Sequence, residues 1–152
     1  DRGGGPSARW RDRVERELAA RGVAPESLYI EPMREYPDFL AGVARADLIL
    51  DSPGFSGGAT SLDAFAMGTP VLCFEGGSAR GRQTSAMLRL MDMPDLIARD
   101  EVSYVDRAVE LLAEPGRLEA LRGLIRERAG RLFDGSASLA AFAAFLRACK
   151  IP

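Results

Sequence analysis

Histidine is absent from this sequence of 152 residues, and cysteine occurs only twice. Without histidine the chain cannot by itself form a His-based zinc site, a Ser-His-Asp triad or a His general base. The two cysteines are Cys73, in a strand-like apolar run, and Cys149, in a helix-like segment. Two isolated thiols are typical of a reducing compartment, so we expect both to be buried and unpaired, and the protein to be cytoplasmic.

An excess of one charge is also missing, because 20 Lys and Arg stand against 22 Asp and Glu. A near-neutral chain has no field that attracts a polyanion, so nucleic acid is not expected as a partner. The apolar runs are far shorter than the roughly 20 residues that cross a bilayer, and no membrane span or signal peptide is predicted. No carboxylate or cysteine cluster has metal-ligand spacing, and no metal or cofactor is predicted.

The composition that remains, 47% hydrophobic and 28% charged, is that of a folded globular protein. Helical periodicity covers residues 7–21 and 37–45, and short apolar runs typical of buried strands lie at residues 28–30, 48–50, 71–74 and 96–98. Short strands that alternate with helices indicate right-handed crossovers and a parallel sheet. The predicted fold class is therefore α/β, a doubly wound parallel sheet over residues 1–98.

Residues 99–152 are predicted to form a helical segment of the same single domain, which would span residues 1–152. Three helices are expected near residues 102–113, 115–130 and 136–149. Apolar residues at helical spacing are the candidates for their inward faces: Tyr104, Val105, Val109, Leu112, Leu118, Leu121, Ile125, Leu139, Phe142 and Leu146.

A glycine-rich loop, residues 52–60, follows the strand at residues 48–50 and leads into a helix. Ligands of open parallel sheets bind at such loops, beyond the carboxyl ends of the strands. The N-H groups of Gly57, Gly58 and Ala59 would stabilise an anion at the positive end of the helix dipole. Thr60 adds a hydroxyl, and Asp63 is placed to accept from a ribose hydroxyl. The alternative is that Thr60 and Asp63 only cap the helix and the glycines only turn the chain.

Residues 46–98 carry an ordered set of motifs: an Ala-Asp pair before a Leu-rich strand, Gly-x-x-Thr-x-x-Asp at residues 57–63, and Gly-Thr-Pro at residues 68–70. Arg82, a Leu-Ile-Ala run at residues 96–98 and Tyr104 continue the series. In order and spacing this stretch resembles the O-GlcNAc transferase family and its bacterial relatives, which are glycosyltransferases with a dual Rossmann-like, or GT-B, core. The resemblance identifies the chain as the carboxy-terminal, nucleotide-sugar-binding half of such a core.

By that resemblance, residues 57–60 would bind the diphosphate of a UDP-sugar, which is the substrate, and Asp63 would bind its ribose. The segment with Met33, Arg34 and Tyr36 would face the uracil. The sugar, GlcNAc or a hexose, would pass to an acceptor protein or glycan. Catalytic groups lie in the half that is missing here, so the chain alone is expected to be inactive. It is expected to need that half, or a swapped copy, beside its sheet.

Two departures from the family pattern keep other functions open. Gly58 and Ala59 stand where the animal enzymes have His and Thr, and Tyr36, Phe39 and Gly42 stand where they have Lys, His and Arg. These losses favour a non-catalytic nucleotide-binding module on the same fold. A protein-interaction scaffold, perhaps joined to helical repeats, is a third hypothesis. Arg82 has two interpretations, as a ligand for a phosphate or acceptor and as a structural brace for its loop, and Glu75 is either a sugar-hydroxyl acceptor or a solvated carboxylate.

Overall fold

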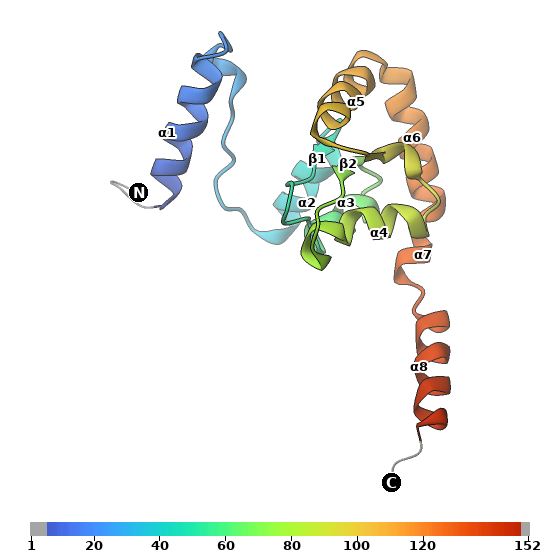
Figure 1. Ribbon diagram of the computed structural model, residues 1–152. Helices are drawn as coiled ribbons and strands as arrows, with labels where there is room; N and C mark the ends of the chain where they lie inside the picture. The colour runs from blue at the N-terminus through green and yellow to red at the C-terminus, as the bar shows by residue number, and fades with distance from the viewer. Residues whose placement is uncertain (1–5, 150–152) are drawn as a thin grey trace. The chain divides into compact units, whose positions relative to one another are not determined.

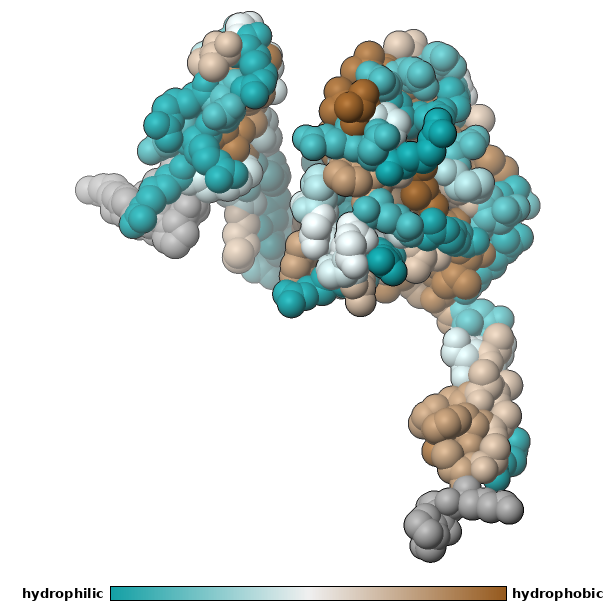
Figure 2. Space-filling view, in the orientation of Figure 1, coloured by the Kyte–Doolittle hydropathy of each residue, from teal (hydrophilic) through white to brown (hydrophobic). Residues whose placement is uncertain are grey.

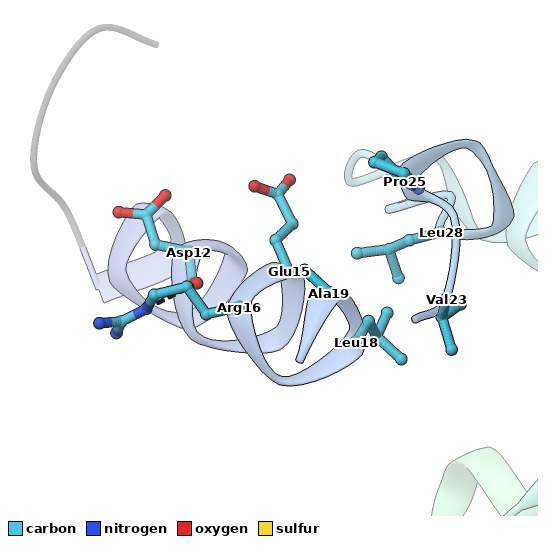
Figure 3. A pocket seen from close by; sticks show the side chains of 8 residues that line it. All are labelled: Asp12, Glu15, Arg16, Leu18, Ala19, Val23, Pro25 and Leu28. Atoms are coloured by element: carbon cyan, nitrogen blue, oxygen red, sulfur yellow. Dashed lines mark hydrogen bonds between the residues drawn. The ribbon is translucent and has the colours of Figure 1, made fainter. Parts of the chain in front are cut away.

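A computed structural model describes residues 6–149, which fall into two compact units that divide between Glu35 and Tyr36 (Figure 1). The first unit holds helix α1 (Pro6–Ala19) and the 3-10 helix η1 (Pro25–Ser27). The helix ends at a turn in which Gly22 adopts φ of 71°, a left-handed conformation that glycine tolerates. An open hollow of about 650 Å³ lies between α1 and the segment after it, lined by Leu18, Val23 and Leu28 among others (Figure 3).

The strand predicted at residues 28–30 is wrong. No strand forms there, and Tyr29 is 74% exposed. A strand needs a neighbour to bond its backbone groups. The described part of the first unit offers none, so an apolar run alone does not produce a strand.

The second unit is built on three short parallel strands, β1 (Ile49–Leu50), β2 (Val71–Phe74) and β3 (Ile97–Ala98), in the order β1-β2-β3. Three of the predicted strands are thereby confirmed. β2 lies in the middle, where it pairs Ile49 with Val71 on one side and Cys73 with Ile97 on the other. The parallel sheet confirms the predicted α/β class.

Helices and helical turns connect and surround these strands. In chain order they are α2 (Tyr36–Arg45), α3 (Ala59–Ala66), η2 (Ala79–Arg82), α4 (Gln83–Leu90), η3 (Pro94–Leu96), α5 (Glu101–Ala113), α6 (Pro115–Arg128), α7 (Gly130–Phe133) and α8 (Ser136–Ala148). Asp100 caps α5 through a capping box with Ser103, which gives that helix a defined start. No helix among the described residues is long and apolar enough to cross a membrane.

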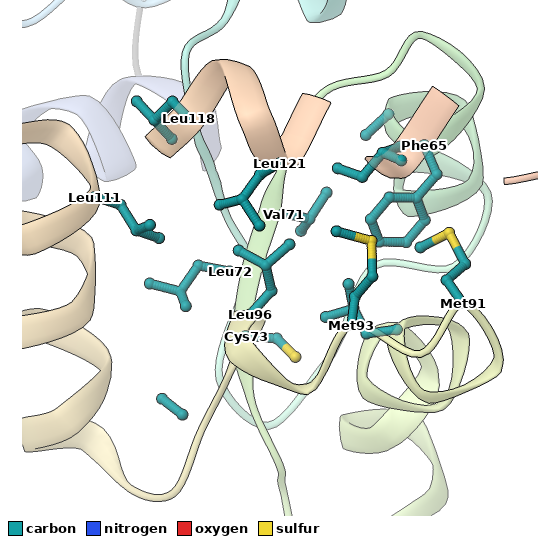
Figure 4. Close-up of a cluster of buried hydrophobic side chains, with 14 of the residues drawn as sticks. Phe65, Val71, Leu72, Cys73, Met91, Met93, Leu96, Leu111, Leu118 and Leu121 are labelled. Carbon is teal, nitrogen blue, oxygen red and sulfur yellow. The ribbon is translucent and has the colours of Figure 1, made fainter. Parts of the chain in front are cut away.

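The core surrounds β2. Successive strand side chains point to opposite faces of a sheet, and in Figure 4 Leu72 lies toward Leu111 of α5 while Val71 lies toward Phe65 of α3. Both faces of β2 are therefore covered, and Val71, Leu72 and Cys73 are almost completely buried. Burial of Cys73 raises the pKa of its thiol to about 12. Cys149 is exposed, so the prediction of two buried thiols is wrong for it.

The helical segment follows the predicted bounds closely but not the predicted faces. On α6, the expected Leu118, Leu121 and Ile125 are buried. On α5, Tyr104, Ala108 and Leu111 face the core instead of Val105, Val109 and Leu112. Because α5 carries apolar residues on two faces, periodicity alone cannot select the buried one.

The candidates on α8, which were Leu139, Phe142 and Leu146, are also exposed. Apolar side chains thus reach the surface over both α5 and α8 (Figure 2).

Candidate functional site

The candidate site lies at the carboxyl end of β1, where the first glycine loop (residues 52–58) runs directly into α3. Gly58 precedes the helix, and no side chain caps its amino terminus. An uncapped helix start leaves backbone N-H groups without acceptors. In the described residues, the N-H groups of Gly58, Ala59 and Thr60 donate to no other residue. Two of the three residues that the sequence assigned to an anion, Gly58 and Ala59, therefore present free donors, together with Thr60.

Gly57 behaves differently from its neighbours. Its N-H group donates to Oδ1 of Asp51 over 2.7 Å, so it is occupied within the protein. An added Cβ at Gly57 would lie 2.4 Å from Oγ of Ser61 and 2.9 Å from Oγ1 of Thr60, which leaves no room for a side chain. Gly57 is thus required by close packing, whereas the sequence predicted a direct contact of its amide with the ligand.

Asp51 and three hydroxyl groups form a buried cluster under the loop. Ser56 Oγ donates to Oδ2 of Asp51 over 2.6 Å, and Thr84 Oγ1 is 2.8 Å from both Ser56 Oγ and Ser61 Oγ. The backbone N-H of Thr84 also donates to Ser56 Oγ, over 2.9 Å. All four side chains are buried, and no buried side-chain polar atom of the described residues lacks a partner. The cluster joins β1, the loop, α3 and α4.

A hollow of about 510 Å³ opens above this cluster. Its wall runs from the edge of β1 across the first glycine loop to the start of α3. The residues that line it are Phe39, Val43, Ile49, Leu50, Asp51, Ser52, Phe55, Ser56, Gly57, Gly58, Ala59, Thr60 and Ser61. Free amides at a helix amino terminus, inside a hollow, suit a phosphate group.

Asp63 lies one turn into α3 and is already engaged. The hydroxyl of Tyr36 donates to Oδ1 of Asp63 over 2.6 Å. That bond favours the neutral phenol and raises the pKa of Tyr36 above its ordinary value. Tyr36 also stacks on Phe39 at a centroid distance of 6.3 Å. The structure therefore brings Tyr36 and Asp63 together, and a ligand hydroxyl would compete with Tyr36 or use the second oxygen of Asp63.

The second glycine loop, which with the strand-end Glu75 comprises residues 75–78, is braced by side chains. Arg82 donates to the carbonyls of Gly76 and Gly77 over 3.1 and 3.2 Å, so the structural interpretation of Arg82 describes this conformation. Glu75 accepts from Ser85 over 2.8 Å and pairs with Arg89. Both bonds, first that from Arg89 and then that from Ser85, lower the pKa of Glu75. Glu75 is thus paired rather than simply solvated.

Met33 and Arg34 belong to the first unit and are described there alone. Met33 is fully exposed, and Arg34 pairs with Glu31. The assignment of these two residues to the base of a nucleotide stays a prediction. In the described residues, no group of three or more His, Cys, Asp or Glu side chains is placed to hold a metal ion.

Sequence reasoning missed the cluster under the loop. Asp51, Ser56, Ser61 and Thr84 are ordinary polar residues in the sequence, and Thr84 lies 28 positions from Ser56. The one available signal was the aspartate at the end of a buried strand, next to a loop of small residues.

The α/β unit with an uncapped glycine loop after its edge strand places the protein among nucleotide-binding, Rossmann-like domains. The sequence profile of glycosyl transferase family 41 matches residues 8–138. The chain therefore belongs to glycosyl transferase family 41, as the resemblance to O-GlcNAc transferases indicated.

Individual relatives agree with this assignment. The UDP-N-acetylglucosamine-peptide N-acetylglucosaminyltransferase of Caenorhabditis elegans is 24% identical over 125 residues, which is 81% of this chain and 11% of that protein. The probable UDP-N-acetylglucosamine-peptide N-acetylglucosaminyltransferase SPINDLY of Solanum lycopersicum is 27% identical over 123 residues, 78% of this chain and 13% of that protein.

A solved structure also matches. A mutant of Thermobaculum terrenum O-GlcNAc transferase superposes with a TM-score of 0.71 at 39% identity, over 78% of this chain and 23% of that one. The match supports the predicted Rossmann-like half of a GT-B core. The chain spans only 11 to 13% of the curated relatives and less than a quarter of the solved one.

Proposed function

We propose that this chain binds the UDP part of a nucleotide sugar, as the carboxy-terminal half of a glycosyltransferase that transfers GlcNAc or a hexose to a protein or another acceptor. One observation carries the proposal: free amides of Gly58, Ala59 and Thr60 line a hollow in which Asp63 lies one helical turn away. The amides and the helix dipole suit a diphosphate without a metal. The carboxylate of Asp63 suits a ribose hydroxyl.

The same site also supports a weaker alternative, a nucleotide-binding module that does not catalyse transfer. Around the hollow, Tyr36 and Phe39 stand where the family resemblance implies cationic or cation-capable groups. Without those groups the leaving diphosphate would be stabilised by amides alone. Under either function, catalytic groups come from outside residues 1–152, and we propose that this chain alone is inactive.

The binding proposal is tested by calorimetric titration of the chain with UDP, UDP-GlcNAc, UDP-Glc and a GDP-sugar. We expect UDP compounds to bind, and Thr60→Ala and Asp63→Ala each to weaken binding by about tenfold, the loss typical of a hydrogen bond to a charged group. Asp95→Ala, which removes an exposed aspartate of η3 outside the hollow, is the matched control. Equal affinity in all four proteins would remove the site from consideration.

The sheet edge supports the expectation of a partner, either the missing half of the enzyme or a swapped copy of the chain. The N-H groups of Ile49 and Asp51 donate to β2, so those of the intervening Leu50 point to the other edge. The Leu50 side chain is 53% exposed, although its register partner Leu72 is fully buried. An open edge with an apolar side chain is a site for strand addition.

Sedimentation velocity of the chain at increasing concentration tests this partner proposal. We expect self-association through the free edge of β1, and less of it in Leu50→Pro, which removes an outward N-H but no bond to β2. Leu50→Ala keeps the N-H and controls for loss of the side chain. A cooperatively folded, monodisperse monomer at all concentrations would contradict the proposal.

A further inference from the structure

The carboxylate of Asp51 is the one charged group in the buried cluster beneath the first glycine loop. Asp51 is only 9% exposed, and its two oxygens accept from Gly57 N-H over 2.7 Å and from Ser56 Oγ over 2.6 Å. Its backbone is fixed as well, because its N-H donates to Leu72 and its carbonyl accepts from the hydroxyl of Tyr104. Asp51 is therefore a rigid point at the end of the sheet from which the loop is held.

Thr84 holds the loop from the opposite side. Its hydroxyl donates to the carbonyl of Gly57 over 3.2 Å and lies 2.8 Å from Ser61 Oγ, while its N-H donates to Ser56 Oγ. Gly57 is thus bonded at both its N-H and its carbonyl, by residues of β1 and α4. A peptide unit bonded on both sides cannot rotate freely, so the direction of the next amides is set.

The bond from Gly57 also has an electrostatic consequence. A carboxylate a few ångströms from an anion site would repel the anion if it were unpaired. Here the Gly57 N-H and the Ser56 hydroxyl both direct their hydrogens at the carboxylate. The amides of Gly58, Ala59 and Thr60 stay free for a ligand. The cluster thereby separates the donors that hold the loop from the donors that bind.

We propose that Asp51, with Thr84, is a positioning residue for nucleotide binding, which fixes the peptide of Gly57 so that the following amides converge on a phosphate before any ligand arrives. The inference rests on the proposed binding of a nucleotide diphosphate. A loop that is ordered in advance loses less conformational freedom on binding, so the free energy of binding is more favourable. Neither Asp51 nor Thr84 needs to touch the ligand for this effect.

Four variants test the proposal by UDP titration: Asp51→Ala, Asp51→Asn, Thr84→Val and Thr69→Val. Thr69 is the matched control, because it is as fully buried as Thr84 and its hydroxyl donates to Val43, away from the loop. We expect Asp51→Ala and Thr84→Val to weaken UDP binding by about tenfold. Asn keeps an oxygen for Gly57 and should restore most of the affinity, and Thr69→Val should leave it unchanged.

Amide hydrogen exchange of the unliganded proteins gives a second readout that needs no ligand. Exchange at residues 57–60 should accelerate in Asp51→Ala and Thr84→Val but not in Thr69→Val. If the wild-type chain binds no UDP compound, the proposed function fails, and exchange alone decides the positioning role. Equal UDP affinity in Thr84→Val and Thr69→Val, or exchange that accelerates uniformly along the chain, would overturn it. If Asp51→Ala does not fold, the pair at Thr84 and Thr69 decides.

Discussion

The two glycine loops occupy equivalent places, each after a parallel strand and before a helical turn, yet only one presents free donors. The first loop, residues 52–58, is held from below by buried side chains and leads directly into α3. The second, residues 75–78, leads into the 3-10 helix η2. There the N-H of Gly76 donates to Gly81, and that of Gly81 to Ser78. Its amides are consumed within the loop.

The comparison shows that glycine content alone does not make an anion site. A cap of Ser78 and a return bond to Gly81 close the second loop on itself. In the first loop Asp51 takes one amide and leaves the next three free. The site is defined by which amides are already bonded, and that depends on residues outside the loops.

The largest effect is expected from exchanging one glycine in each loop for alanine. In Gly57→Ala the new Cβ would meet Ser61 Oγ at 2.4 Å, and Ser61 is buried and bonded to Thr84. Overpacking of this kind costs about 1 to 3 kcal/mol of unfolding free energy, and we expect UDP binding to be lost with it. Thermal unfolding and calorimetric titration measure both effects.

Gly77→Ala is the matched change in the second loop, where no atom lies within 4 Å of the new Cβ. We expect this variant to unfold and to bind UDP as the wild type does. A similar loss in both variants would show that the two loops are equivalent, which would remove the distinction between them.

The smallest effect is expected from the surface contacts of the second loop, tested by pH. Arg89 and Ser85 lower the pKa of Glu75 from its ordinary value of 4.5. A carboxyl group with a lowered folded pKa stabilises the protein above its unfolded pKa, and the contribution disappears as the pH falls through the folded value.

Glu75→Gln should therefore lower the melting temperature slightly at neutral pH, by less than about 1 kcal/mol of unfolding free energy since the pair is exposed. The difference from the wild type should shrink below pH 4.5. UDP affinity should not change. A constant difference at every pH would mean that the ionised pair with Arg89 contributes nothing.

Much of the fold was predictable because local patterns and tertiary packing agree there. The runs that became β1, β2 and β3 alternate with helices, and Leu118, Leu121 and Ile125 occupy one face of a helix that buries it. The failures occur where the pattern is ambiguous or incomplete. The run at residues 28–30 has no strand beside it, and α5 has two apolar faces of similar size.

The sequence by itself determined the family, the α/β class and the loop before α3, because these depend on the order and spacing of residues along the chain. Only the tertiary structure decided how the site is held. Asp51, Ser56, Ser61 and Thr84 come from four segments, and their hydrogen bonds exist only once β1, α3 and α4 have packed. Hydrogen bonds depend on distance and direction in space, and neither can be read from positions so far apart in the chain.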